Sequence, residues 1–181
     1  MMKNMTAIIL SLALLVGVNC PVCFAGDTEE ARLAAEGELY VYVMGFLEPI
    51  KKTRAYGQRI KTAVKLIPHI VYLSSQAGID PLLVAVMVSY ESSWNFAAVG
   101  KLGERGPLQV HGQAAKGYNP SDPIEGLQAG IEHLSRALGI CGDIPGALTR
   151  YGTGNRCKPE AKFVTFRMKA YEKAKKTYRT N

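Results

Sequence analysis

The pattern of apolar and polar positions predicts a chain made mostly of helices. The clearest helix begins at Asp80, a residue suited to capping, followed by Pro81, whose fixed φ and missing N–H suit the first turn. Residues 82–88 are then apolar without interruption. Because a helix with no polar face must be buried on all sides, the pattern predicts a central helix that ends near Glu91.

Other segments have the spacing or the caps of helices. They are residues 28–52, 59–77, 123–138, 144–151 and the tail from Lys158. Thr28 is suited to cap the first, whereas the second is expected to break at Pro68, because proline lacks a backbone donor and clashes with the preceding turn. Residues 96–121 are rich in glycine and small polar residues, which indicates loops with at most a small β element. These elements predict one mainly α domain.

The tail from Lys158 carries most of the chain's net charge of +7, with eight basic residues against Glu160 and Glu172. Apolar side chains recur along it at helical spacing: Phe163, Phe166, Ala170, Ala174 and Tyr178. These positions predict an amphipathic helix. The basic face of such a helix is usually in contact with solvent alone. The alternative is attraction to acidic wall polymer, anionic lipid or a partner protein. Because the aromatic residues lie on the packing face, we expect no nucleic acid partner.

Residues 1–25 have the pattern of a signal peptide. Lys3 gives a positive start, residues 6–18 form a short apolar run, and Ala25 is a small residue at the cleavage position. The run is too short to favour a transmembrane helix, although an uncleaved anchor stays open as the alternative. We therefore expect residues 26–181 to be exported as a periplasmic or secreted domain.

Two cysteines follow the expected cleavage site. Cys20 and Cys23 would be removed with the signal peptide, so their spacing is not read as a redox or zinc motif. Cys141 and Cys157 are then predicted to form a disulfide, as expected in an oxidising compartment, and two free thiols are the alternative. The sequence contains no metal or phosphate motif, and we expect no cofactor.

The position of Glu91 predicts an unusual carboxyl group. It follows Val88 and Met87 at helical spacing and precedes Trp94 by three residues, which places it among apolar neighbours. Burial disfavours the charged form and so raises the pKa of a carboxyl, and a carboxyl protonated near neutral pH can act as a general acid. The alternative is an ordinary helix-end glutamate that points into water.

The residues around Glu91 resemble a family signature. The matching positions are Glu91, Ser92, Trp94, Asn95, Gly103, Gly106, Gln109 and Val110. Later matches are Gly130, Leu134 and residues 147–154. Together, over about residues 66–157, they resemble the lysozyme-like lytic transglycosylases of the soluble (SLT) type, which cleave the glycan strands of peptidoglycan. The resemblance implies a lysozyme-like domain of the goose-type and SLT kind. The helix predicted over residues 28–52 and the basic helix of the tail are expected to extend this domain at its two ends.

The resemblance also implies roles for individual residues. Glu91 would be the catalytic acid, and the substrate would be bound by Ser92, Gly106, Gln109, His111 and Tyr151. The chain departs from the family at Gly100, Leu108, His111 and Gly152, where Ser, Met, Met and Asn are frequent, and at His133, where Tyr is usual. These departures concern contacts with sugar, and His133 is expected to have a packing role.

The implied reaction is lytic cleavage of the bond between N-acetylmuramic acid and N-acetylglucosamine, with 1,6-anhydro ends as products. One acid suits this substrate-assisted route, since no second carboxylate stands out. A first alternative is a goose-type lysozyme-like hydrolase that uses Glu104 or Asp122 to activate water. A second is a weakly active or inactive peptidoglycan-binding component of a secretion, conjugation or pilus apparatus. We expect a monomer in each case.

Overall fold

The computed structural model describes residues 28–158 and 161–178, with side chains from residue 164 onward in the second range. Its elements are α2 (Glu29–Leu47), η1 (Glu48–Ile50), α3 (Arg54–Gln76), α4 (Pro81–Glu91), η2 (Gly112–Ala115), α5 (Pro123–Cys141), α6 (Ile144–Thr153) and α7 (Ala161–Tyr178). No strand occurs in the described ranges, where β pairing is limited to two isolated antiparallel bridges that Arg105 forms with Val99 and Val110. The predicted mainly α fold is confirmed. The expected signal peptide lies outside the described residues.

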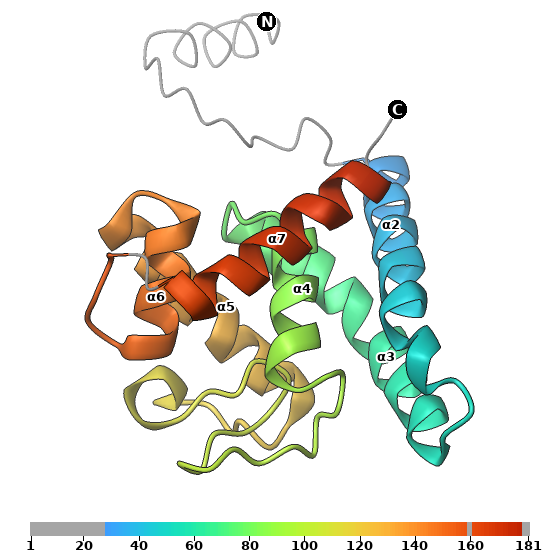
Figure 1. The fold of residues 1–181 in the computed structure, drawn as a ribbon, viewed down its shortest axis with the longest axis horizontal. Helices are drawn as coiled ribbons and strands as arrows, with labels where there is room; N and C mark the ends of the chain where they lie inside the picture. Colours follow the sequence, from blue (N-terminus) through green and yellow to red (C-terminus); the bar gives the residue numbers. More distant parts are fainter. Residues whose placement is uncertain (1–27, 159–160, 179–181) are drawn as a thin grey trace, which may run out of the picture.

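Helix α4 lies at the centre of the domain, as its sequence predicted. Every residue from Pro81 to Ser89 is buried, and Asp80 caps the helix by accepting a hydrogen bond from the backbone N–H of Leu82 at 2.9 Å. Helices α2 and α3 lie to one side of α4 and α5 and α6 to the other, while α7 crosses over it (Figure 1). None of the described helices is long and apolar enough to cross a membrane. This arrangement brings the C-terminal end of α4 beside α7.

Helix α3 continues through Pro68, so the predicted break is wrong. Proline cannot donate to the carbonyl of Val64 one turn earlier. The hydroxyl of Tyr40 on α2 lies 3.5 Å from that carbonyl oxygen, at the long limit of a hydrogen bond. Leu66, Ile67 and Ile70 around the proline are fully buried. Their burial against neighbouring helices is worth more than the missing bond, so tertiary packing overrides the local preference.

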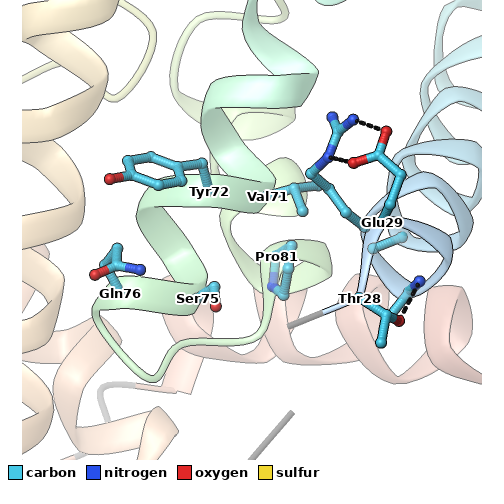
Figure 2. Close-up of a pocket in the computed structure, with 10 residues that line it drawn as sticks. Thr28, Glu29, Val71, Tyr72, Ser75, Gln76 and Pro81 are labelled. Carbon is cyan, nitrogen blue, oxygen red and sulfur yellow. Dashed lines mark hydrogen bonds and ion pairs between the residues drawn. The ribbon is translucent and has the colours of Figure 1, made fainter. Parts of the chain in front are cut away.

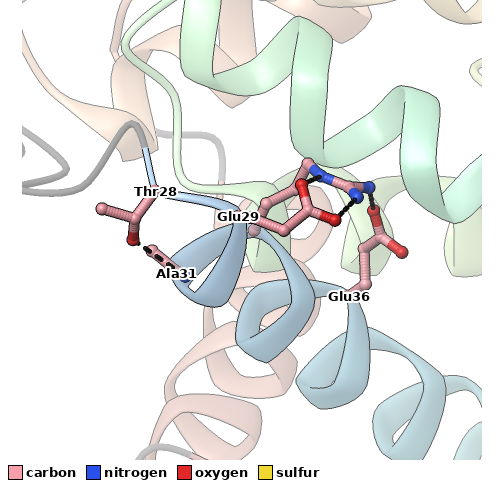
Figure 3. A network of polar contacts seen from close by, with 5 residues as sticks. Thr28, Glu29, Ala31 and Glu36 are labelled. Atoms are coloured by element: carbon pink, nitrogen blue, oxygen red, sulfur yellow. Dashed lines mark hydrogen bonds and ion pairs between the residues drawn. The ribbon is translucent and has the colours of Figure 1, made fainter.

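The N-terminal end of α2 is fixed by side chains. The Thr28 hydroxyl accepts from the backbone N–H of Ala31 at 3.3 Å, which agrees with its predicted role as a cap. Arg32 binds the carboxylate of Glu29 at 2.6 Å and also pairs with Glu36 one turn further on, as Figure 3 shows. Residues 48–50 leave the α-helix as a short 3₁₀ turn, so α2 is shorter than predicted.

Helix α7 packs on part of the predicted face, since Ala174 is buried and Ala170 and Tyr178 are partly buried against the core. Its buried side chains are Val164, Arg167, Tyr171 and Ala174. Phe166, assigned to the packed face from its spacing, is 68% exposed, and the side chain of Phe163 lies outside the described residues. A basic residue, Arg167, therefore lies among the buried side chains of this helix.

A disulfide joins Cys141 at the end of α5 to Cys157 beyond α6, as predicted. The loop that it closes contains all of α6 and therefore Tyr151. Its packing is tight, because a side chain added at Gly146 would place Cβ 2.8 Å from the carbonyl oxygen of Cys157. The bridge thus fixes the position of α6 relative to the end of α5.

We predict that replacing both cysteines by serine lowers the free energy of unfolding by about 3 kcal/mol, because the unfolded chain regains the entropy of an open 16-residue loop. For a domain of this size the melting temperature should fall by about 6 to 12 °C. Thermal unfolding followed by circular dichroism measures the change. Reduced wild-type protein should melt with the double variant, and equal melting of the variant and the oxidised wild type would contradict the prediction.

Candidate active site

A cleft of about 640 Å³ opens at the C-terminal end of α4. Its walls come from the end of α4, the loop that follows, α5 and α6. The lining residues are Glu91, Gly100, Leu102, Glu104, Gln109, Val110, His111, Gln113, Ala114, His133, Tyr151, Gly152, Thr153 and Gly154. The cleft thus gathers the predicted acid with side chains from three later parts of the chain.

Glu91 is the last residue of α4, and its side chain is only 16% exposed. Burial raises the pKa of this carboxyl above its ordinary value, the guanidinium of Arg167 opposes the rise, and the negative charge of Glu104 adds to it. The alternative of a glutamate pointing into water is therefore wrong. A carboxyl whose pKa is raised inside a cleft has the properties of a general acid.

Arg167 is the partner of Glu91 that the sequence interpretation missed. Its Nη2 donates a hydrogen bond to Oε1 of Glu91 at 2.7 Å, and its side chain is 10% exposed. Arg167 is one of the eight basic residues of the tail, whose charged face is expected to be solvated. A signal was present, since Arg167 lies three residues after Val164 and four before Tyr171, on the stripe that the structure buries.

The chain turns sharply after Glu91. Ser93 and Trp94 both have positive φ, at 51° and 62°, although neither is glycine. The ring of Trp94 is fully buried, and its Nε1 donates to the hydroxyl of Ser89 at 2.9 Å. Ser89 also accepts from the hydroxyl of Tyr42 at 3.0 Å. Burial and these bonds hold the turn in place, so Trp94 supports the site from the core.

Gln109 lies in the cleft on a tightly held loop. Its side-chain nitrogen donates to the carbonyls of Ala98 at 3.1 Å and Gly106 at 2.9 Å. Arg105 and Val110 exchange two backbone hydrogen bonds beside it. Since the loop uses both hydrogens of the amide, a contact with substrate would use the amide oxygen.

Tyr151 on α6 lines the cleft. Its hydroxyl donates to the carbonyl of Leu108 at 2.7 Å. Burial and then the negative charge of Glu91 raise the pKa of this phenol well above its ordinary value, so it stays protonated. The ring of His133 packs on it with centroids 4.8 Å apart, and burial lowers the pKa of His133. This contact fits the packing role expected for His133.

The other predicted substrate residues divide into two groups. His111 is exposed and lines the cleft. Ser92 and Gly106 are outside the residues that line the cleft. The Ser92 hydroxyl donates to the carbonyl of Val88 at 3.2 Å. Gly106 is buried and has a φ of 78°. A side chain at Gly106 would place Cβ 2.5 Å from the carbonyl oxygen of Pro120. Local structure accounts for these two residues, and a contact of either with substrate stays a prediction.

A second carboxylate, that of Glu104, lines the same cleft. Its Oε2 accepts from the backbone N–H of Leu102 at 2.8 Å, and backbone hydrogen bonds from Glu104 itself and from Leu102 lower its pKa. The carboxylate lies over Gly100, where an added Cβ would come within 2.2 Å of Oε2. The family's frequent serine at Gly100 is therefore incompatible with this position of Glu104.

Asp122, the other base considered for a hydrolase, is outside the residues that line the cleft. It caps α5 by accepting from the backbone N–H groups of Ile124 at 2.8 Å and Glu125 at 3.0 Å. These two hydrogen bonds lower the pKa of Asp122, and the one from Glu125 has the larger effect. The geometry thus leaves Glu104 as the second carboxylate near Glu91.

A separate hollow of about 200 Å³ lies between the start of α2 and the end of α3 (Figure 2). Thr28, Val71, Tyr72 and Pro81 contribute to its walls. Glu29, the carboxylate there, is already paired with an arginine of the same helix. Within residues 28–158 and 161–178, no group of three or more His, Cys, Asp or Glu side chains could hold a metal ion. The candidate chemistry therefore concentrates in the cleft at Glu91.

Comparison with known families agrees with this geometry. The family model of the transglycosylase SLT domain matches residues 69–175, from within α3 to the last turn of α7. No curated protein and no solved structure was found to match the chain. Because the matched region includes α4, the cleft and α7 and spans more than half of the 181 residues, the chain belongs to the transglycosylase SLT domain family, whose members act on peptidoglycan as lytic transglycosylases.

Proposed function

We propose that this protein is an exported lytic transglycosylase in which Glu91 is the only proton donor and acceptor at the scissile bond. The observation that carries the proposal is a mostly buried carboxyl with a raised pKa, lining a cleft of about 640 Å³ in an SLT domain. The bond that the enzyme would cleave is the β-1,4 linkage between N-acetylmuramic acid and N-acetylglucosamine. The volume of the cleft lies within the range that is usual for ligand sites in proteins.

The reaction uses one carboxyl twice. Protonated Glu91 gives its proton to the glycosidic oxygen as the C1–O bond breaks, and the substrate's acetamido group stabilises the positive charge that develops at C1. The carboxylate of Glu91 then takes the proton of the sugar's 6-hydroxyl, whose oxygen closes on C1. The products are a free 4-hydroxyl and a 1,6-anhydro end, and Glu91 is protonated again without consuming water.

The cleft residues supply contacts on either side of this acid. We assign the amide oxygen of Gln109 to an acetamido N–H or a hydroxyl of the glycan, and the exposed ring of His111 to the rim of the cleft. The phenol of Tyr151, which stays protonated, can donate to a sugar oxygen only by giving up its bond to Leu108. These assignments follow from donor and acceptor capacity.

A hydrolase of the goose-lysozyme kind is the second candidate, because Glu104 shares the cleft with Glu91. In that reaction Glu104 would activate a water molecule, and the product would carry a hydroxyl at C1 in place of the anhydro bridge. The signal-peptide pattern of residues 1–25 supports export, and a role beside a secretion, conjugation or pilus apparatus follows only by analogy with small exported enzymes of this kind.

Glu91→Gln should lower the rate at which anhydro-muropeptides are released by about 10² to 10⁴ times, because the amide keeps the shape but cannot supply the proton as the carboxyl does. Digestion of purified peptidoglycan followed by mass spectrometry measures the release. Circular dichroism must show that the variant is folded as the wild type is. An unchanged rate for the folded variant, or a wild type that releases no fragments, would refute the enzymatic proposal.

Glu104→Gln separates the two candidates. A transglycosylase should still form anhydro ends at a rate within about tenfold of wild type, whereas a hydrolase would lose its base. Removing this negative charge also lowers the pKa of Glu91, so the fall of the rate at alkaline pH should begin at a lower pH. Product mass identifies the reaction, since hydrolytic ends are heavier by one water. Hydrolytic products that vanish in the variant would establish the second candidate.

Export predicts a defined mature chain. The full chain is expressed in a bacterium that has a protein secretion pathway. We expect to recover the protein outside the cytoplasm with residue 26 as its first residue, because cleavage follows the small residue Ala25. Intact mass and N-terminal sequencing check the site. A full-length chain found only in the cytoplasm would remove this part of the proposal.

A further inference from the structure

Helix α7 delivers a positive charge to the acid from 76 residues further along the chain. Arg167 binds Oε1 of Glu91 at 2.7 Å, and its guanidinium lies 5.9 Å from the centroid of the Tyr90 ring. Both members of the ion pair are largely buried, at 10% and 16% exposure. A buried pair of this kind is poorly screened by solvent and salt, so it acts strongly on the carboxyl.

The position of Arg167 is fixed by a second contact on the next turn of α7. The hydroxyl of Tyr171 donates to Oδ2 of Asp80 at 2.5 Å, while Oδ1 of Asp80 caps α4. Arg167 and Tyr171 lie four residues apart, on one face of α7. Tyr171 binds the N-cap of α4, and Arg167 binds the carboxyl at its other end. The hydrogen bond between Tyr171 and Asp80 thus limits how far Arg167 can move from Glu91.

We propose that Arg167 is a positioning residue of the reaction, which holds one oxygen of Glu91 and stabilises its anionic form between the two proton transfers. The inference rests on the proposed role of Glu91 as acid and base. Because Oε1 accepts the hydrogen bond from Arg167, the transferable proton sits on Oε2. The ion pair thus orients the carboxyl as well as balancing its charge.

The proton must leave Glu91 and return in one turnover, so neither form of the carboxyl can be strongly preferred. Burial disfavours the anion, and the negative charge of Glu104 from the facing loop does so too. Tyr151 from α6 stays protonated and adds no charge, and the ring of His133 on α5 packs against it. Arg167 from α7 opposes burial and Glu104. Without it, Glu91 would hold its proton too tightly to be an efficient acid.

Arg167→Met tests this inference, because methionine keeps an unbranched apolar stem and removes the charge. The pKa of Glu91 should rise by about one to three units, and since the protonated form is the active donor, the alkaline fall of the pH–rate profile should move upward by the same amount. The rate on the acidic plateau should fall at least about tenfold, with KM little changed. Titration of ¹³C-labelled glutamate by NMR reads the carboxyl directly, with Glu91→Gln identifying its signal.

Two further variants make the outcome decisive. Arg167→Lys keeps the charge without the planar fork, so it should restore the pH profile to within about half a unit while leaving the rate reduced. Arg54→Met removes one positive charge at the exposed start of α3 and should change neither readout. If Arg167→Met does not fold, the lysine variant alone still tests positioning, because a change confined to KM would overturn the inference.

The two proposals fail in different ways. A wild type that releases no anhydro ends contradicts the proposed function, yet the NMR titration of Glu91 still reports whether Arg167 acts on it. If the arginine variants leave the Glu91 titration and the alkaline limb unchanged while anhydro ends are formed, the positioning role is wrong and the enzymatic proposal stands.

Discussion

The burial of α4 over most of its length is the constraint on which the site depends. Residues Pro81 to Ser89 are buried, so the polar groups at the two ends of the helix need partners from the protein. Asp80 at one end is held by Tyr171 and by its own helix, and Glu91 at the other end is held by Arg167. Helix α7 therefore serves both ends of α4. Glu91 is also largely buried at the end of this helix, and its burial raises the pKa of the carboxyl.

The loop after Glu91 forms part of the cleft into which this largely buried carboxyl opens. Ser93 and Trp94 adopt left-handed backbone conformations that cost of order 1 kcal/mol or more each, and the burial of Trp94 with its bond to Ser89 offsets that cost. The chain then returns with Leu108 packed against Gly130, where an added side chain would place Cβ 2.5 Å from Leu108 atoms. Leu108 is also where Tyr151 docks, through its backbone carbonyl. The cleft is thus bounded by segments that are each anchored in the core.

Sequence patterns predicted the features that depend on neighbouring residues along the chain. The cap at Thr28, the buried helix ending at Glu91 and the disulfide between Cys141 and Cys157 all follow from local chemistry or from the expected compartment. The break expected at Pro68 failed because packing outweighs one missing hydrogen bond. The packed face of α7 was predicted only in part, because Phe166 is exposed. Arg167 is buried there instead, paired with a carboxylate from a distant segment of the chain. Interactions between distant segments decide such cases, and a single sequence does not encode them as a periodic pattern.

Glu104 shows how a departure from the family pattern bears on the chemistry. Gly100 leaves the space that this carboxylate occupies, and backbone N–H groups hold it as an anion with a lowered pKa. A carboxylate with a low pKa is a weak base, so it is poorly suited to take a proton from water. Its fixed negative charge in the cleft can instead stabilise positive charge that develops on a sugar ring as the glycosidic bond breaks. The same charge disfavours ionisation of Glu91 and so supports its protonated form. On these grounds Glu104 is an electrostatic neighbour of the acid, and the cleft favours a reaction in which Glu91 alone moves the proton.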